Sequence, residues 1–155
     1  MAYKTILNEK KSSTGGPYCF YTVQYEEKSR TASAVKLGIK ILAHLQYAES
    51  YYGYSATATL TVGGTAFSIK LKGNEMWSGT GVHTITQDIT VSAAAGTTSL
   101  AAKFAVTTGS GNAALSSTAC SNITISKYYT AASISASTAA IGAGVDVYKR
   151  QGFMQ

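Results

Sequence analysis

Charged side chains, histidine, proline and cysteine are all scarce in this chain of 155 residues. Charged residues make up 13% of it, with two histidines, two cysteines and one proline. His44 and His83 stand apart from any further pair of metal-binding side chains, so the spacing typical of metal sites is missing. The sequence has no G-x-S-x-G nucleophile turn and no phosphate loop leading into a helix. We therefore expect a binding or structural protein rather than an enzyme, with no catalytic residue, no metal site and no cofactor.

Arginine is nearly absent, although the formal net charge is +6. Arginine supplies most of the planar forks that bind phosphates and bases. The basic residues are mostly lysines, and they are scattered along the chain rather than gathered into one patch. Lysines on outward strand faces and at sheet edges are solvated and discourage edge pairing. The composition therefore predicts surface lysines and no nucleic-acid partner.

Long apolar runs are missing as well. No segment approaches the roughly 20 apolar residues of a membrane span, so we expect no membrane insertion. The N-terminus MAYKTILNEKK lacks the apolar core of a signal peptide, because Ile6 and Leu7 stand alone. We expect a protein made in the cytoplasm, with Cys19 and Cys120 as buried thiols. The alternative is one disulfide that closes a loop of about 100 residues.

The clearest pattern that is present is a strict alternation of apolar and polar residues. Val35, Leu37 and Ile39 share one parity, and Lys36 and Lys40 share the other. A period of two is typical of a half-buried strand. The alternation recurs along the chain and predicts seven strands, at residues 18–25, 34–45, 56–62, 67–71, 82–91, 100–106 and 119–126.

The spacing of these segments predicts the fold class. Gly63-Gly64 between two alternating runs indicates a two-residue hairpin with positive φ at the turn. About seven strands at this spacing predict an all-β fold, an antiparallel two-sheet sandwich with immunoglobulin-like character, although the Cys-Trp-Cys spacing of antibody domains is missing. A short helix over residues 39–51 is the alternative for that segment, because it contains Leu, Ala, Gln and Glu.

Composition divides the chain into four parts. Residues 1–17 are expected to form a flexible N-terminal arm that ends at Pro17, and residues 18–127 the sandwich. Residues 128–145 are interpreted as a linker and the start of a truncated second module. The hexapeptide DVYKRQ at 146–151 can be encoded by GATGTGTATAAGAGACAG, which resembles a transposon end used to tag DNA for sequencing. We therefore interpret residues 146–155 as an artefactual tail.

Aromatic residues supply the candidate binding site. Exposed aromatic rings stack on sugars and anchor protein interfaces. The alternative is that these rings pack over the end of the sandwich, with the tryptophan as a lid on the core. The candidate ligand or subunit contacts are four tyrosines of one connection and the tryptophan of another loop: Tyr47, Tyr51, Tyr52, Tyr54 and Trp77.

Several segments carry a family resemblance. They are YKTIL at residues 3–7, KKSSTGGPY at 10–18, SRTA at 29–32, AHLQY at 43–47 and LSSTACS at 115–121. Over about residues 1–131 the chain resembles the tail-associated minor structural proteins of siphovirus-type bacteriophages. Residues 132–137 resemble the start of the next module in such proteins.

The resemblance implies a non-enzymatic structural component of a phage tail tip or fibre that contributes to host-surface recognition. It implies strings of β-sandwich modules in a virion assembled in the host cytoplasm. The implied partners are other tail proteins, host cell-wall glycans and further copies of the chain in a homo-oligomer. The alternatives are a bacterial surface adhesin or carbohydrate-binding module, and a mount for an enzymatic domain outside this sequence. The resemblance assigns no catalytic or receptor-binding residue to this chain.

Overall fold

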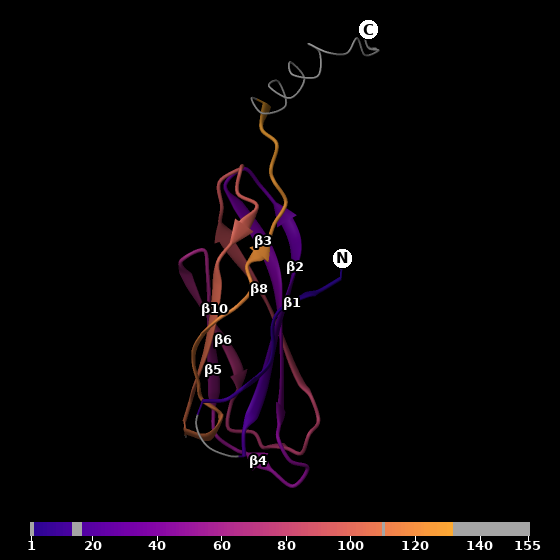
Figure 1. Ribbon diagram of the computed structural model, residues 1–155, viewed down its shortest axis with the longest axis vertical. Coiled ribbons are helices and arrows are strands. Elements are labelled where there is room, and N and C mark those ends of the chain that lie inside the picture. Colours follow the sequence, from indigo (N-terminus) through magenta and orange to yellow (C-terminus); the bar gives the residue numbers. More distant parts are fainter. Residues whose placement is uncertain (1, 14–16, 110, 132–155) are drawn as a thin grey trace.

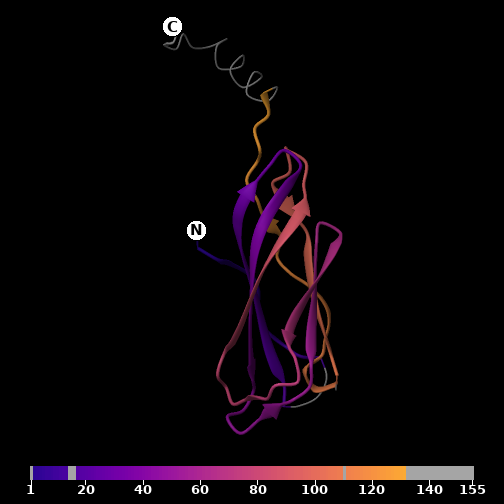
Figure 2. The same cartoon turned by 180° about the vertical axis from the view of Figure 1, so that it is seen from behind.

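The protein is built from two four-stranded antiparallel sheets whose strands run along the long axis (Figures 1 and 2). The structure is a computed structural model that describes residues 2–13, 17–109 and 111–131. The first sheet has the order β1-β2-β3-β8, with bounds Lys4–Lys11, Cys19–Arg30, Ala34–Leu45 and His83–Ser92. The second has the order β11-β10-β5-β6, with bounds Leu115–Ala119, Ala102–Thr108, Ala56–Val62 and Thr65–Lys72.

Two short ladders form separate two-stranded sheets. One pairs β4 (Tyr51–Tyr52) with β7 (Trp77–Ser78), and the other pairs β9 (Ser99–Leu100) with β12 (Ile123–Thr124). A single 3-10 turn, η1, covers Gly111–Ala113. The all-β prediction is confirmed, with about twelve strands rather than seven. The strands of the short ladders are too brief to show a period, and β1 is irregular. In the described part of the chain no helix has the length and apolarity to cross a membrane.

The core lies between the two sheets and follows the predicted alternation. Every second residue of β3 from Val35 to Ala43 is fully buried, so the strand prediction holds and the helical alternative for residues 39–51 is wrong. The two sheets meet at Tyr21 and Phe104, whose ring centroids are 6.0 Å apart. The Tyr21 hydroxyl donates to the carbonyl of Ala113 at 2.6 Å, which satisfies the one polar atom that this ring brings into the core.

The predicted hairpin is confirmed as β5–β6. Gly63 and Gly64 have φ values of +57° and +86°, the left-handed region that other residues adopt at a cost. Positive φ at both turn positions matches the type of turn whose twist suits a two-residue hairpin. The register runs from Val62 opposite Thr65 toward Ala56 opposite Lys72.

The N-terminal segment corrects one expectation. Eight of the 17 residues predicted as an arm form strand β1, which pairs with β2 and buries Ile6. The pattern was hidden because two register shifts break the pairing and Glu9 adopts a φ of +48°. A bulge of this kind moves neighbouring side chains out of the period of two. The first sheet therefore includes residues that the sequence assigned outside the sandwich.

The bulge at Glu9 brings its carboxylate to His44 of β3. Oε1 of Glu9 lies 2.7 Å from Nε2 of His44, whose ring stacks on Phe20. His44 lies on the outer face of the first sheet, on the same parity of β3 as Lys36 and Lys40. Burial opposes protonation, but the Glu9 carboxylate and the Leu45 carbonyl outweigh it and raise the pKa of His44 above 6.5. The ion pair therefore forms when the imidazole is protonated.

We expect this pair to make stability pH-dependent. A raised pKa in the folded state stabilises the fold below pH 6.5, and the stabilisation is lost as pH rises through the folded value. Denaturation midpoints measured from pH 5 to pH 9 should fall for the wild type relative to His44→Gln across that window. Glu9→Gln should remove the difference between the two. Parallel pH profiles for the wild type and His44→Gln would contradict the assignment.

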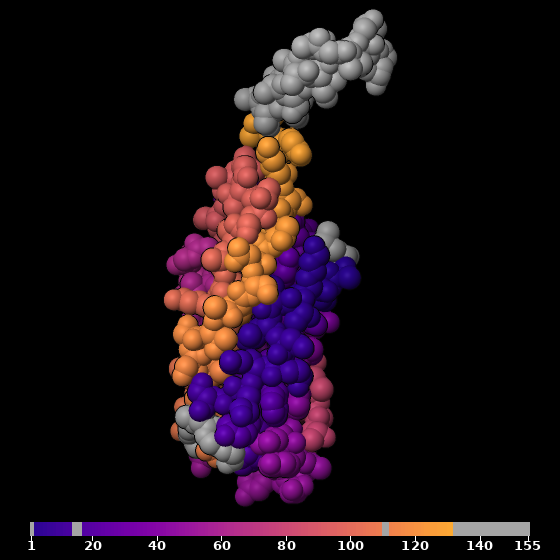
Figure 3. Space-filling model, viewed as in Figure 1, coloured from indigo at the N-terminus to yellow at the C-terminus, as the bar shows by residue number. Residues whose placement is uncertain are grey.

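The segment after β11 closes one flank of the molecule. Backbone hydrogen bonds join Ser13 to Ala114 and Ser121 to Ile6, so β1 of the first sheet is tied to the edge of the second. Figure 3 shows this segment, in orange, lying against the indigo N-terminal strand. The strand expected over residues 119–126 is interrupted, although Ile123 and Ile125 within it are buried.

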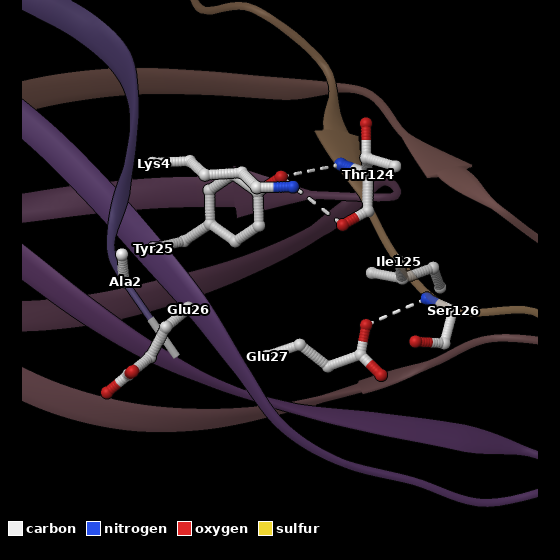
Figure 4. A pocket seen from close by; sticks show the side chains of 8 residues that line it. All are labelled: Ala2, Lys4, Tyr25, Glu26, Glu27, Thr124, Ile125 and Ser126. Atoms are coloured by element: carbon white, nitrogen blue, oxygen red, sulfur yellow. Dashed lines mark hydrogen bonds between the residues drawn. The ribbon is translucent and has the colours of Figure 1, made fainter.

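Arg30, at the end of β2, binds the C-terminal part of the segment after β11, at Ser126. Its guanidinium has five N–H groups, some of them shared, that donate to the carbonyls of Thr31, Ala34, Ala93, Ala94, Ala95, Thr97 and Ser126 at 2.6–3.3 Å. Glu27 accepts a hydrogen bond from the Ser126 amide at 2.7 Å, and the Tyr25 hydroxyl bonds both the amide and the carbonyl of Thr124 (Figure 4). The described chain leaves the sandwich at this end, past Tyr128, whose amide donates to Ala95.

Both cysteines are free thiols, as predicted. Cys19 is buried and Cys120 is partly exposed. Desolvation raises the pKa of each thiol to about 11, so neither is a reactive thiolate near neutral pH. The second module and the artefactual tail predicted after residue 131 lie outside the described residues.

Candidate functional site: the tyrosine pole

The tyrosine-rich connection forms the end of the molecule opposite the chain exit, where β4 is labelled in Figure 1. The two-residue ladder of β4 and β7 sets Tyr51 opposite Ser78 and Tyr52 opposite Trp77. Successive residues of a strand point to opposite faces. The ladder therefore places one pair of aromatic rings inside the molecule and leaves Tyr51 outside.

Exposure separates the five predicted contact residues into two groups. Tyr47, Tyr51 and Tyr54 are 51%, 69% and 55% exposed. Tyr52 and Trp77 are buried in the core, so Trp77 is the lid of the alternative interpretation rather than a ligand contact. We call the surface formed by Tyr47, Tyr51 and Tyr54 the tyrosine pole. Three rings with solvated hydroxyls offer rigid amphipathic area of the kind that binds sugars and proteins.

A glycine fixes the two loops against each other. Gly79 has a φ of +72°, and its amide donates to the carbonyl of Ser50 at 2.9 Å. A Cβ at this position would lie 3.3 Å from the carbonyl oxygen of Ala48. The left-handed conformation and this close approach together favour glycine. The loop of Trp77 is thereby held beside the loop that carries Tyr47 and Tyr51.

Lys72 lies beneath the tyrosine pole, which the expectation of solvated lysines did not foresee. The side chain is buried, and Nζ donates to the carbonyls of Tyr54 at 2.7 Å and Gly73 at 2.9 Å. Nζ also lies 5.2 Å from the ring centroid of Tyr52 and 5.6 Å from that of Trp77. Desolvation lowers the pKa of Lys72, although nearby Glu75 opposes the shift. A lysine at the end of β6 reaches this position because its stem is long and flexible.

His83 lies next to Trp77 in the layer of side chains beneath the tyrosine pole. Its ring stacks on Trp77 with centroids 4.3 Å apart and planes 4° from parallel. Desolvation and then the charge of Lys72 lower the pKa of His83, so the imidazole is neutral at physiological pH. Its buried Nε2 has no hydrogen-bond partner among the described residues. This layer of Lys72, Trp77 and His83 is a support for the pole, because its members face inward.

A hollow of about 560 Å³ opens at the tyrosine pole. This volume falls in the range of small-ligand sites. Its polar groups include the exposed Glu49 carboxylate and the Asn112 side chain, both able to bond hydroxyl groups. The lining residues are Pro17, Tyr47, Glu49, Ser50, Tyr51, Tyr52, Gly53, Tyr54 and Asn112.

A second hollow, of about 230 Å³, lies at the other end between β2 and the C-terminal segment (Figure 4). The Tyr25 hydroxyl and the Glu27 carboxylate on its wall are engaged with Thr124 and Ser126. These groups hold the fold together and are not free for a ligand. Within residues 2–13, 17–109 and 111–131 no three His, Cys, Asp or Glu side chains gather as metal ligands do.

The sequence alone identifies the cluster of tyrosines, but it does not identify the other residues that line the hollow or lie beneath it. Glu49 and Asn112 come from segments more than sixty positions apart, and no periodicity links them. Lys72 has the composition of a surface residue. Comparison with protein-family models, curated proteins and solved structures finds no match to this chain. The function is therefore argued from the site and from the resemblance given above.

Proposed function

We propose that this chain is a non-enzymatic structural module of a phage tail tip or fibre, and that its tyrosine pole contacts glycans of the host cell wall. The observation that carries the proposal is the position of Tyr47, Tyr51 and Tyr54 at the end of the sandwich opposite the chain exit. In a string of modules, the end away from the connection is the one free to meet a surface. The family resemblance of residues 1–131 supplies the tail context.

The chemistry of the pole suits neutral saccharides. Tyrosine rings stack on the apolar faces of sugars, and their hydroxyls bond sugar hydroxyls. The hollow adds a carboxylate and an amide, Glu49 and Asn112, which accept and donate such bonds. A few polar groups on an apolar floor are typical of small-ligand sites. The pole would work by binding, since no nucleophile or acid–base pair is part of it.

The proposal includes an immunoglobulin-like topology, which strand order supports. If β1 is left out and the other seven long strands are numbered in chain order, the first sheet contains the first, second and fifth strands, side by side in that order (β2-β3-β8). The second sheet contains the seventh, sixth, third and fourth strands, side by side in that order (β11-β10-β5-β6). Immunoglobulin constant domains share this order except that their fourth strand lies beside the fifth. Here β6 lies beside β5, and β1 is added outside β2.

Binding to purified Gram-positive cell walls tests the pole. The triple variant Tyr47→Ala, Tyr51→Ala, Tyr54→Ala should bind at least about tenfold more weakly, because exposed aromatic anchors carry much of the energy of an interface. The measurement is a pull-down titration with cell walls, with competition by soluble wall saccharides. All three side chains are exposed, so the melting temperature should change little.

A matched control is available at the opposite end. Tyr128 and Tyr129 are also exposed. Tyr128→Ala with Tyr129→Ala should leave binding unchanged. An equal loss in both variants would indicate nonspecific adsorption, and unchanged binding of the pole variant would refute the pole as the site. The tail context is tested separately by sequencing the source DNA across Val145: further β modules beside tail genes support it, and a different genomic setting refutes it.

A further inference from the structure

Strand β8 is the one long, regular sheet edge in the described part of the chain. Edge strands are usually protected by lysines, prolines, bulges or short length. β1 has two register shifts and three lysines, β11 has five residues and a shift, and β6 has a shift and two lysines. β8 pairs with β3 over all ten residues without a shift, and it contains neither lysine nor proline.

The centre of this edge is open to solvent. Ile85 and Gln87 share the inward parity of the buried Ile89, yet Ile85 is only partly buried and Gln87 is exposed. The Gln87 side-chain amide donates to the carbonyl of Ser68 on β6 at 3.3 Å, on the side of the second sheet. A hollow of about 400 Å³ adjoins the same stretch and is lined by Tyr3, Lys28, Thr86, Gln87 and Asp88. On the outer face, Asp88 is held by Lys28 at 3.0 Å and Lys36 at 3.7 Å. The hollow lies over the outer face of the sheet, toward Tyr3 and Lys28. An added strand would meet an edge that has no neighbouring strand in its sheet.

We propose that β8 pairs with β8 of a second copy in an antiparallel, two-fold arrangement centred on Gln87. Side chains keep their faces only in registers that set residues of equal parity opposite each other. The register centred on Gln87 sets Ile85 opposite the partner's Ile89 on the inner face. On the outer face it sets Thr86 opposite the partner's Asp88.

The neighbouring registers are less favourable. Centring on Asp88 would set two carboxylates opposite each other, and centring on Thr86 would set Ile85 opposite a glutamine. Like charges directly opposite destabilise a pair of strands, and apolar cross-strand pairs stabilise it. The self-complementary pattern of β8 argues for a second copy as its occupant. This inference does not depend on the proposed function, because antiparallel pairing sets the two tyrosine poles at opposite ends and covers neither.

Substitutions at Thr86 separate association from folding. Within one chain Thr86 lies opposite Lys40 of β3, whereas across the dimer it lies opposite Asp88 of the partner. Thr86→Glu should therefore leave the fold intact or raise its melting temperature, yet weaken dimerisation about tenfold through two like-charge pairs. Thr86→Lys should do the reverse and strengthen dimerisation while lowering the melting temperature slightly.

The measurement is sedimentation equilibrium of the full chain from low micromolar to near-millimolar concentration. One added strand pair buries less area than a stable complex, so we expect micromolar rather than nanomolar dissociation. Thr59→Glu, on the exposed outer face of β5, is the matched control and should not change association. A monomer at every concentration overturns the proposal. So does a dimer that Thr86→Glu and Thr86→Lys affect in the same direction or not at all.

Discussion

Replacing Arg30 with alanine is expected to lower the free energy of unfolding by about 2–4 kcal/mol, since hydrogen bonds to a charged group contribute roughly 1.5–3 kcal/mol each and water replaces part of the loss. One side chain donates to seven carbonyls, which belong to the β2–β3 turn, the loop after β8 and the segment that leaves the domain. The carbonyls of Ala34 and Ala95 would keep a backbone donor, from Thr31 and Tyr128, whereas those of Ala93 and Thr97 would lose the guanidinium in a partly buried setting. Urea denaturation followed by fluorescence measures the change.

Two further variants define the reason for this loss. Arg30→Lys keeps the charge but offers three donors on one nitrogen, so we expect it to recover less than half of the stability. Lys103→Ala removes an exposed cation from the outer face of the second sheet and should change stability little. If Arg30→Lys were as stable as the wild type, charge rather than the forked geometry would be the cause. If Arg30→Ala matched Lys103→Ala, the contacts with the carbonyls would have no net effect.

Replacing Phe104 with alanine is expected to cost about 3–5 kcal/mol, the range for a fully buried phenylalanine. Phe104 lies on β10 in the middle of the second sheet, and its ring meets Tyr21 across the core. Truncation removes one of the largest side chains packed between the two sheets and leaves a cavity that the strands cannot collapse to fill. Thermal and urea denaturation should both show the loss, with the melting transition lowered by more than ten degrees.

The same sheet contains its own control for this substitution. Phe104, Leu60 and Phe67 lie opposite one another in a row across β10, β5 and β6. Phe67 is at the edge of the sheet and is only partly buried. Phe67→Ala should therefore cost about 1–2 kcal/mol, because less apolar area leaves water when that ring packs. Equal losses at the two positions would show that burial does not govern the energetics of this row.

Local periodicity predicted those parts of the fold in which pairing is regular. The segment from Val35 to Ala43 and the Gly63-Gly64 hairpin are determined by neighbours in sequence, so a period of two and two glycines suffice. β1 escaped prediction because its register shifts twice, between Thr5 and Leu7 and between Leu7 and Lys10, and Glu9 within the second shift adopts a left-handed conformation. β4 and β7 escaped because two residues show no period.

The candidate site likewise has one part that local sequence predicts and another that depends on long-range contacts. Clustering in sequence identified the three exposed tyrosines, since residues of one loop remain together in space. The burial of Tyr52 and Trp77 depends on which residues lie opposite each other in the β4–β7 ladder, and on a lysine twenty residues away from Tyr52. The role of Arg30 depends on partners up to 96 positions away in the chain. Long-range contacts of this kind leave no trace in composition or spacing.

The attachment of the C-terminal segment also determines how the domain carries mechanical load. Tension applied beyond Tyr128 enters the sandwich through Ser126, where Arg30 and Glu27 transmit it to the end of β2. β2 and β3 are paired along almost their whole lengths, parallel to the long axis (Figure 2). The β2–β3 turn lies at this loaded end, so a pull passes from Arg30 along the covalent backbone of β3 to Leu45, two residues before Tyr47. The tyrosine pole can thus be anchored at one end and pulled from the other without peeling the first sheet apart.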